Sequence, residues 1–395
     1  MTHSLFGYAL GRVGADRFGG SEPECRAMVW SSVAASNVPD LDVVVNLVAA
    51  DPKLAYLVHH RGHTHTLLLA FPLGVVVALL CARIAGVGGP GRRRVLALGG
   101  LAGMFHIAFD ALNNYGVHPF FPLDNGWYYG DAVFIVEPLL LAVMLPLLAL
   151  RGRSRTARAI GGGLSVMLLA LLWGQWPLPL PWAVKLPVTL LLATAFAVQS
   201  CSAGRAEPGL LGVASVIGLF VVLSVRADAQ VRAHLARSAG DERVLDVVTS
   251  PFPGSPLCWS AIAVTHDDQK RYRARFGYLS LAPGLVGTSD CMMPRDEVTA
   301  PLQPARLPAT GGLLWTGRFE AAVGELRQLS QQHCDARAML GFVRAAFWRA
   351  DSSGVVLGDL RYDFEPGLGF AERRLDGRCS DWLPSWDPPL GELLR

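Results

Sequence analysis

The feature that most constrains this chain is a long stretch with very little charge. Only eight charged side chains occur between positions 67 and 150, namely Arg83, Arg92, Arg93, Arg94, Asp110, Asp124, Asp131 and Glu137. In the whole chain of 395 residues, 51% are hydrophobic and 17% are charged, whereas a soluble globular protein carries about 25% charged residues. This composition excludes a disordered chain and predicts a membrane as the solvent of the stretch.

Apolar runs of membrane-spanning length recur through the first 225 residues. A transmembrane helix needs about 20 mostly apolar residues. Six segments meet or approach this length: residues 66–84, 95–112, 132–150, 159–175, 183–201 and 209–225. The first residues lack the basic region and long apolar run of a cleavable signal peptide, so we expect them to belong to the mature protein.

The distribution of arginine and lysine predicts the orientation of these spans. Arginines gather in the loops 91–94, 151–158 and 201–207, whereas the loops 113–131 and 176–182 contain no Lys or Arg. Short positive loops stay in the cytoplasm. Residues 1–65, the loop 113–131 and everything after residue 226 are therefore expected on the outer side. Three arginines of the N-terminal segment, Arg12, Arg17 and Arg26, count against this orientation.

From residue 227 onward the composition is that of a soluble domain. Alternating polarity predicts strands at residues 244–249, 261–265, 272–281 and 354–364, and helical periodicity predicts helices at 318–331 and 335–349. The sequence thus predicts three parts: an N-terminal helical segment (1–66), an α-helical polytopic membrane domain (67–226) and a soluble, extracytoplasmic α+β domain (227–395). The net charge of +3 provides no basic face for a nucleic acid.

The soluble domain contains four cysteines: Cys258, Cys291, Cys334 and Cys379. An even number in an extracytoplasmic domain could form two disulfides, and four cysteines allow three pairings. Four unpaired thiols in the core are the alternative. No CxxC spacing typical of a zinc site is present.

Side chains able to bind a metal concentrate before residue 140. His3 lies almost at the start, and Asp40 and Asp42 flank a single leucine, a pattern that a surface turn or a helix cap would also explain. Residues 59–65 then contain four of the ten histidines of the chain. Imidazole is the commonest metal ligand, so His65 is a candidate ligand. The neighbours His60 and Arg61 could contact an anionic substrate, since a guanidinium matches phosphate or carboxylate.

The most specific signal is the pair His106 and Asp110 in the second predicted span. Side chains at positions i and i+4 of a helix lie on one face, so the imidazole and the carboxylate could hold one ion together. An ionisable pair in a membrane span is a functional hypothesis by default. A hydrogen bond that joins two helices is the alternative.

Further candidates follow in the next loop and span. They are His118, Asp131 and Glu137, each weaker because a helix cap or a buried hydrogen bond would explain the acids equally well. Five aromatic residues share the loop: Phe120, Phe121, Trp127, Tyr128 and Tyr129. They are typical of an interfacial aromatic belt, which beside a metal site could also hold a lipid.

The predicted topology places these candidates at the same leaflet. His65 lies at the outer end of the first predicted span. His106 and Asp110 lie in the outer end of the second, and Asp131 and Glu137 lie at the outer end of the third. The orientation was inferred without these residues, so their convergence independently supports one cluster. Nitrogen and oxygen ligands without thiolate suit Zn, Mn or another first-row ion.

The order of these motifs resembles the YdjM-like bacterial inner-membrane proteins, which are described as membrane-bound metal-dependent hydrolases. The resemblance rests on Thr2-His3, Pro39-Asp40-Leu41-Asp42, His60-Arg61-Gly62-x-Thr64-His65, His106-x3-Asp110 and Asn113-x-Tyr115-Gly116. It covers about the first 140 residues, and residues 250–253 and 256–259 resemble longer members with a soluble domain. Glu137-Pro138 stands where such proteins tend to have Asp-Pro.

A more distant resemblance is to the zinc phospholipases C and the zinc single-strand nucleases. Their ligand order is matched by His3, Asp40, His65, His106 and Asp110. The resemblance implies that Asp110 bridges two ions. The second His-x3-Glu pair that holds a third ion in that group has no clean match here, so about two ions are expected.

These observations together predict a metal-dependent hydrolase at the outer face of the inner membrane. The resemblance implies a phosphoester substrate carried by a lipid or another amphiphile, although composition and spacing would suit ester or amide hydrolysis as well. Asp42 or Asp40 would be the general base, and Arg61 or His60 would contact the anion. A non-enzymatic membrane protein that binds or transports a metal, or a scaffold for partners of the soluble domain, is the alternative.

Overall fold

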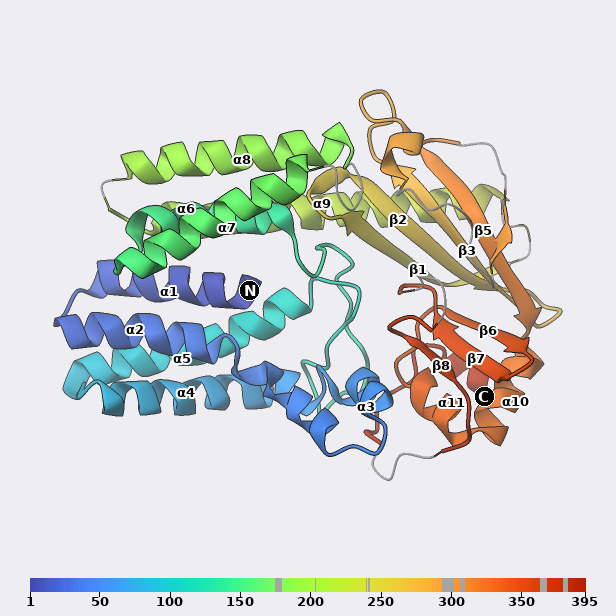
Figure 1. Cartoon of the computed structure of the whole chain (residues 1–395). Helices are drawn as coiled ribbons and strands as arrows, with labels where there is room; N and C mark the ends of the chain where they lie inside the picture. Colours follow the sequence, from blue (N-terminus) through green and yellow to red (C-terminus); the bar gives the residue numbers. More distant parts are fainter. Residues whose placement is uncertain are drawn as a thin grey trace.

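The computed structural model describes residues 1–174, 180–202, 204–238, 240, 242–292, 302–305, 310–362, 368–378 and 383–395. Its N-terminal half is a bundle of helices, and its C-terminal part is built on β-sheet (Figure 1). The predicted combination of a helical membrane part and a domain with strands and helices is confirmed at this level.

The bundle contains long helices that lie side by side and run along one common direction (Figure 1). They are α1 (Thr2–Phe18), α2 (Glu22–Ala35), α4 (Leu67–Ile84), α5 (Gly89–Asp110), α6 (Pro138–Arg151), α7 (Arg155–Trp173), α8 (Trp182–Cys201) and α9 (Glu207–Ser238). Several begin where the sequence offers an N-cap: the hydroxyls of Ser21, Thr66 and Ser154 accept a hydrogen bond from the first turn of α2, α4 and α7.

Three short helices connect α2 to α4 at one end of the bundle. They are η1 (Val38–Leu47), α3 (Pro52–His59) and η2 (His63–His65). Prolines stand in the first turns of η1 and α3, where a missing backbone N–H costs no hydrogen bond. This connection carries most of the side chains of the predicted site.

Small residues let α4 and α5 approach each other closely. Any Cβ at Gly74, Gly99 or Gly103 would collide with the facing helix, at backbone or side-chain atoms. Because lipid tails are as apolar as leucine, helices in a membrane associate through such close packing rather than through burial of apolar surface. The geometry at these three positions therefore requires glycine.

Four described helices are long and apolar enough to cross a membrane: Leu67–Ile84, Arg155–Trp173, Trp182–Cys201 and Glu207–Ser238. The predicted number of six spans is not confirmed. The predicted span 95–112 lies in α5, which begins with three arginines and buries ten residues against its neighbours. The predicted span 132–150 is shortened because the helix begins only at Pro138, with Glu137 as its N-cap.

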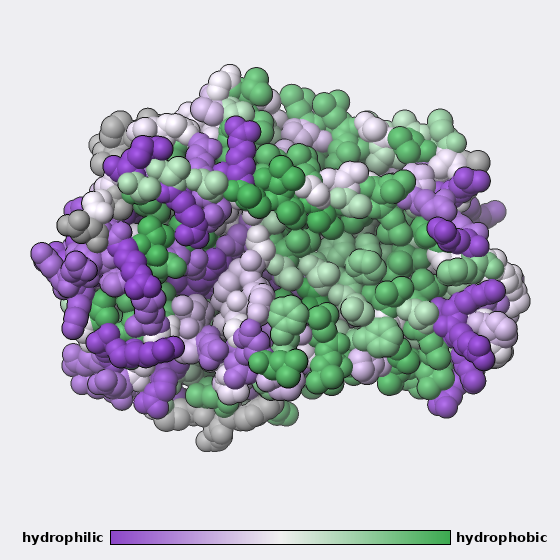
Figure 2. Space-filling view, turned by 180° about the vertical axis from the view of Figure 1, so that it is seen from behind, coloured by the Kyte–Doolittle hydropathy of each residue, from purple (hydrophilic) through white to green (hydrophobic). Residues whose placement is uncertain are grey.

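The hydropathy of the surface differs between the helical part and the C-terminal domain. Figure 2 shows apolar side chains over much of the helical part, and hydrophilic side chains over the C-terminal domain and at the opposite end of the bundle. On this face the helical part thus presents an apolar surface between two hydrophilic ends, as expected of a membrane protein.

The basic turns of the chain meet at the end of the bundle that lies away from the β-sheets. Arg94 donates a hydrogen bond to the carbonyl oxygen of Phe18, Tyr8 to that of Arg151, and the backbone N–H of Ala206 to Asp16. The turn between α1 and α2 therefore lies beside the three predicted positive loops. The arginines that counted against the predicted orientation, Arg12, Arg17 and Arg26, belong to this hairpin, and Arg17 lies at its turn.

The C-terminal domain contains two antiparallel sheets. The first has the order β1-β2-β3-β5-β4 and the second β6-β7-β8. The strands are β1 (Arg243–Phe252), β2 (Ser255–His266), β3 (Arg271–Ser280), β4 (Gln303–Pro304), β5 (Leu313–Ala322), β6 (Ala346–Asp351), β7 (Gly354–Asp359) and β8 (Glu372–Arg374). The helical elements are η3 (Thr288–Cys291), α10 (Val323–Gln332), α11 (Cys334–Leu340) and α12 (Gly391–Leu394).

Two predicted helices of this domain are wrong in part. The segment 318–331 begins as the end of β5, because residues 318–322 pair with β3, and becomes helical only at Val323. The segment 335–349 leaves the helix at Leu340 and continues as β6. Pairing with distant strands overrides the local helical periodicity in both places. The predicted strand 354–364 is β7, and its last two residues lie outside the described residues.

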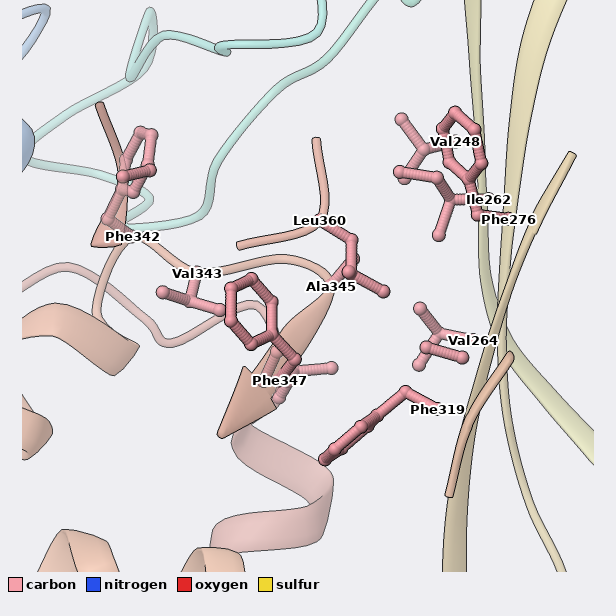
Figure 3. Packing of buried hydrophobic residues seen from close by; sticks show 14 of the residues in the cluster. Val248, Ile262, Val264, Phe276, Phe319, Phe342, Val343, Ala345, Phe347 and Leu360 are labelled. Atoms are coloured by element: carbon pink, nitrogen blue, oxygen red, sulfur yellow. The ribbon is translucent and has the colours of Figure 1, made fainter. Parts of the chain in front are cut away.

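The core of this domain lies between its two sheets. Figure 3 shows Val264 and Phe319 of the first sheet facing Phe347 of β6 across this core. A disulfide joins Cys258 of β2 to Cys291 of η3. Of the two alternatives that the sequence left open, four unpaired thiols is therefore wrong, and Cys379 lies outside the described residues.

Candidate metal centre

Four potential ligands converge at the end of the bundle that faces the C-terminal domain. Asp40 lies in η1, His65 ends η2, and His106 and Asp110 lie one turn apart near the end of α5. One ligand atom of each lies within 4.8 Å of the others. We call this group the metal centre. The structure thus unites four of the five residues predicted as principal ligands.

The separations from the two imidazole nitrogens to each other and to the two carboxylate oxygens match the edges of a tetrahedron around one cation. His65 Nε2 lies 3.4 Å from Asp40 Oδ1 and 3.3 Å from Asp110 Oδ2, and His106 Nε2 lies at the same distances from these two oxygens. The two Nε2 atoms are 3.1 Å apart. Ligands held tetrahedrally about 2.0–2.1 Å from a cation are about 3.3–3.4 Å from one another. The spacing therefore fits one small divalent cation.

Hydrogen bonds on the far side of each imidazole fix which nitrogen faces the centre. His106 Nδ1 lies 2.8 Å from the carbonyl oxygen of Ser36, which can only accept, so Nδ1 carries the proton. His65 Nδ1 lies 3.2 Å from Asp42 Oδ2, a carboxylate oxygen that likewise accepts. In both neutral rings Nε2 then presents a lone pair to the centre, which is how metal-binding histidines are oriented.

Without a cation this arrangement is unfavourable. The Nε2 atoms of the two imidazoles lie 3.1 Å apart, and the buried Asp110 Oδ2 lies 3.3 Å from each of them. Burial lowers the pKa of His65, but its hydrogen bonds to Asp110, Asp40 and Asp42 outweigh this effect and raise the pKa to about 10. The carboxylates thus favour a positive charge at this point, which a proton or a metal ion can supply. The residues present therefore fit a bound metal.

Asp42 contacts the Nδ1 atom of His65, on the side of the ring that faces away from the metal centre. One carboxylate oxygen accepts from His60 Nδ1 at 2.9 Å, and the other accepts from the backbone N–H of Arg61 at 2.9 Å and from the Thr64 hydroxyl at 3.1 Å. Burial alone raises the pKa of Asp42, but the hydrogen bonds from His60 and His65 hold it well below its usual range. Asp42 is therefore a charged group that orients His60 and His65.

Arg61, predicted to contact an anionic substrate, reaches the same cluster. Its guanidinium lies 3.0 Å from Asp110 Oδ1, donates to Asn113 Oδ1 at 2.8 Å and covers the ring of Tyr115 at 4.8 Å. The φ angle of Arg61 is 61°, a left-handed conformation that is rare outside glycine. The side chain is thus held beside the metal centre by three different partners.

His3 lies beside the group of four rather than in it. Its Nε2 is 3.2 Å from Asp110 Oδ1, the oxygen that Arg61 also contacts, and its ring stacks on that of His106 at 4.0 Å. Asp110 therefore turns one oxygen to the other three ligands and the second oxygen to His3. The prediction that Asp110 bridges two ions stays a prediction.

The three weaker candidates have other partners. His118 lies 3.3 Å from the carbonyl oxygen of Arg61 and stacks on Trp386. Asp131 forms an ion pair with Arg344 at 2.8 Å, and Glu137 accepts hydrogen bonds from the backbone of α6 and from Gly254. Three of these partners, Trp386, Arg344 and Gly254, belong to the C-terminal domain, whose position the sequence did not reveal. The structure does not bring these three residues into the metal centre.

A cavity of about 330 Å³ opens beside the centre. The described residues that line it come from both parts of the chain: Tyr56, His60, Arg61, Tyr115, Ile135, Tyr362 and Phe370. His60 and Arg61 thus belong both to the surroundings of the metal centre and to the cavity wall. The sequence did not predict Tyr362 and Phe370 as residues of the site, because no local pattern around them indicates that they lie near His60 and Arg61.

Two other contributions to the site also escaped the sequence analysis. The carbonyl oxygen of Ser36 sets the tautomer of His106, and a backbone atom leaves no signal in the sequence. Trp386 donates a hydrogen bond to the carbonyl oxygen of Val58 and stacks on His118. Its separation of more than 300 residues from Val58 makes the contact invisible to any local pattern.

Comparison with known proteins identifies the N-terminal part of the chain. Residues 1–179 match the family described as YdjM inner membrane protein. The resemblance drawn from the motifs is thereby confirmed, whereas that to the zinc phospholipases C is not shown. No curated protein and no solved structure matches the chain.

Proposed function

We propose that this protein is a membrane-bound, metal-dependent hydrolase that cleaves a phosphoester of a lipid or another amphiphile. The observation that carries the proposal is the convergence of two Nε2 atoms and two carboxylate oxygens in the metal centre, all within 4.8 Å of one another. The YdjM family match supports the membrane setting. The resemblance to zinc phosphoesterases in the order of the ligands supports the reaction class.

The ligand set favours Zn²⁺, with Mn²⁺ as the alternative. Asp40, His65, His106 and Asp110 would hold the ion through two nitrogens and two oxygens, a combination that suits first-row metals. His3 and the second oxygen of Asp110 would begin a site for a second ion. A divalent cation in this position supplies Lewis-acid activation of water and neutralises charge on the phosphoryl oxygens.

The protein's own side chains supply proton transfer and positioning. Asp42 accepts a hydrogen bond from His60 Nδ1, which leaves Nε2 of His60 as the nitrogen able to take a proton. His60 also lines the cavity beside the centre. We therefore assign the role of general base to His60 and that of positioning residue to Asp42. Arg61 holds Asp110 in place and presents positive charge to the cavity.

We place the metal centre and the C-terminal domain on the outer side of the membrane. The three positive loops and the turn between α1 and α2 meet at the opposite end of the bundle, and positive ends stay in the cytoplasm. The disulfide between Cys258 and Cys291 agrees with an oxidising compartment.

Elemental analysis of the detergent-purified full chain tests the metal centre. After repletion with Zn²⁺, the wild type should retain at least one equivalent, and Asp110→Ala should retain none. His234→Ala, which changes a histidine of α9 outside the centre, is the matched control and should bind like the wild type. Equal metal in Asp110→Ala and wild type, or none in either, would overturn the proposed centre.

Hydrolysis is tested separately with a panel of phospholipids and soluble phosphoesters. We expect turnover that requires Zn²⁺ or Mn²⁺ and that His60→Gln reduces at least 100-fold while metal content stays unchanged. Stoichiometric metal with no turnover of any substrate would contradict the hydrolase and favour a non-enzymatic metal-binding protein.

A further inference from the structure

We propose that the cavity between the metal centre and the C-terminal domain binds the head group of a ring-bearing, phosphorylated amphiphile. The C-terminal domain would then select the substrate by supplying one wall of the site. The inference rests on the proposed function and extends it to the chemical class of the substrate.

Both parts of the chain build this cavity. Tyr56, His60, Arg61, Tyr115 and Ile135 come from the helical part, and Tyr362 and Phe370 face them from the C-terminal domain. A volume of about 330 Å³ lies at the lower end of the range of small-molecule sites. The space is therefore suited to one ring with its substituents.

The walls of the cavity are mostly flat aromatic rings. The ring of Phe370 lies 5.7 Å from that of Tyr56 and 5.3 Å from that of Tyr362, in both cases edge to face, and 6.4 Å from that of Tyr115. Such rings offer faces and edges on which another ring packs with a defined geometry. The walls therefore favour a sugar or aromatic ring over an unbranched chain.

Two polar atoms of the wall lack a partner. Arg61 Nε and the hydroxyl of Tyr362 are buried, and neither makes a hydrogen bond with any described residue. Arg61 is only 6% exposed, so its unpaired N–H is costly unless a ligand or water satisfies it. Acceptor oxygens of a phosphate or of ring hydroxyls would satisfy both groups, and a guanidinium prefers the charged acceptor.

The surroundings of the cavity favour an amphiphile over a soluble metabolite. Ile135 lines the cavity, and its neighbours Phe134 and Val136 are also exposed large apolar residues. Three exposed apolar residues in succession are expected to contact lipid in a membrane protein. They lie just before α6, so an apolar tail could pass from the cavity along them into the bilayer.

The two walls are held in a fixed relation by hydrogen bonds outside the cavity. Trp386 donates to the carbonyl oxygen of Val58 at 2.9 Å, and Arg361 donates to that of Asn114 at 2.6 Å. The backbone N–H of Asp387 donates to the carbonyl oxygen of Asn125 at 3.1 Å. The cavity is therefore preformed, and selection by its shape does not require the domains to close.

The test measures binding of phenyl phosphate and methyl phosphate to the Zn²⁺-loaded full chain in detergent by titration calorimetry. Both probes carry the same phosphate, and only phenyl phosphate carries a ring. We expect phenyl phosphate to bind at least 10-fold more tightly. Phe370→Ala should remove this preference by weakening phenyl phosphate about 10-fold, with methyl phosphate and metal content unchanged.

Phe370 is 38% exposed, so its truncation should leave the fold intact, which the thermal unfolding midpoint checks. Phe120→Ala, at an exposed aromatic residue outside the cavity lining, is the matched control and should keep the preference. Equal affinities of the wild type for the two probes, or a preference unchanged in Phe370→Ala, would overturn the proposed head-group site.

The outcome separates this inference from the proposed function. Selective binding of phenyl phosphate without hydrolysis of any substrate would uphold the head-group site and contradict the hydrolase. Hydrolysis with no preference for the ring-bearing probe would uphold the hydrolase and overturn the head-group site.

Discussion

Two clusters of buried charged side chains lie near the contact between the helical part and the C-terminal domain. They differ in how their charges are paired. In the metal centre, Asp40 and Asp110 share the space with His65 and His106, and Arg61 is the permanent cation beside them. The second cluster consists of Arg344 and Arg361 with Asp131, Asp246 and Asp359. We call it the arginine clamp.

Every carboxylate of the clamp faces a guanidinium. Arg344 contacts Asp131 at 2.8 Å and Asp246 at 3.0 Å, and Arg361 donates to Asp359 at 2.7 Å. The ring of Tyr129 lies under the guanidinium of Arg344 at 4.1 Å. The clamp is thus internally satisfied and joins the loop before α6 to the C-terminal domain.

The comparison distinguishes a binding site from a structural contact. The metal centre gathers two carboxylates and two imidazoles beside a single guanidinium, so a bound metal ion would neutralise its remaining negative charge and stabilise it. The clamp already contains its cations, so it gains nothing from a ligand and loses much when one partner is removed. Four experiments test this distinction, in order of decreasing expected effect.

Removal of Arg344 should cause the largest loss of stability. In Arg344→Met, the carboxylates of Asp131 and Asp246 stay buried without their cation, and breaking such a pair costs about 3–5 kcal/mol. The free energy of unfolding, measured by denaturant titration of the detergent-solubilised chain, should fall by this amount. Metal content should not change. A loss below about 1 kcal/mol would show that the clamp is not structural.

Metal addition should stabilise the wild type but not a variant of the centre. At a free Zn²⁺ concentration of about 100 Kd, the free energy of unfolding should rise by about 2.7 kcal/mol. His106→Ala removes one of the four ligands and should lose this increment, whereas Arg344→Met should keep it. An increment of equal size in His106→Ala would place the metal elsewhere.

Asp42→Asn should weaken metal binding without abolishing it. Asparagine keeps the shape of the side chain but lacks the negative charge of the Asp42 carboxylate, which orients the His65 ring through Nδ1. Loss of a group that orients a ligand typically lowers metal affinity about 10–100-fold. Competition with a chelator measures the change. Asp124→Asn, at an acid of the neighbouring loop outside the centre, should leave the affinity as it is. Complete loss of metal in Asp42→Asn would instead identify Asp42 as a direct ligand.

Acid should weaken the contact between the two parts of the chain through His118. Burial lowers the pKa of this histidine to about 3, against about 6.5 in the unfolded chain, so between these values the unfolded chain binds the proton. Stability is therefore complete above pH 6.5 and falls below it, by at most about 2 kcal/mol at pH 5.

The difference between wild type and His118→Phe isolates this effect, because phenylalanine can keep the stacking on Trp386 but does not titrate. Unfolding monitored by tryptophan fluorescence at pH 7 and pH 5 gives the comparison. Identical pH dependence of the two proteins would exclude His118 as the acid-sensitive group.

Much of the metal centre could be predicted because its ligands have local signatures. The spacing of His106 and Asp110 places both on one face of a helix, and a charged pair inside an apolar segment requires a function. Asp40 and His65 stood out through the motif order. Asp131 and Glu137 were the weaker candidates, and their partners Arg344 and Gly254 belong to the C-terminal domain, which no local pattern places beside them.

For the fold, too, local patterns predicted the elements that depend on local sequence and failed where distant segments pack together. Apolar runs predicted α4, α7, α8 and α9, because length and hydropathy alone decide whether a helix can span a bilayer. The spans predicted at α5 and α6 are not confirmed, because α5 carries three arginines near its start and α6 has only 14 residues. Residues 318–322 carry a helical pattern, but their pairing with β3 makes them the end of a strand.

The sequence by itself thus determined that the chain is a membrane protein with a His/Asp cluster and a C-terminal domain of mixed structure. These properties follow from hydropathy and helical periodicity, which act over at most about 20 residues. The tertiary structure decided which ligands meet, which tautomers their rings adopt, and which acids are neutralised by arginine instead. It also decided that Tyr362 and Phe370 close a cavity beside Arg61, because residues 300 positions apart become neighbours only through packing of the whole chain.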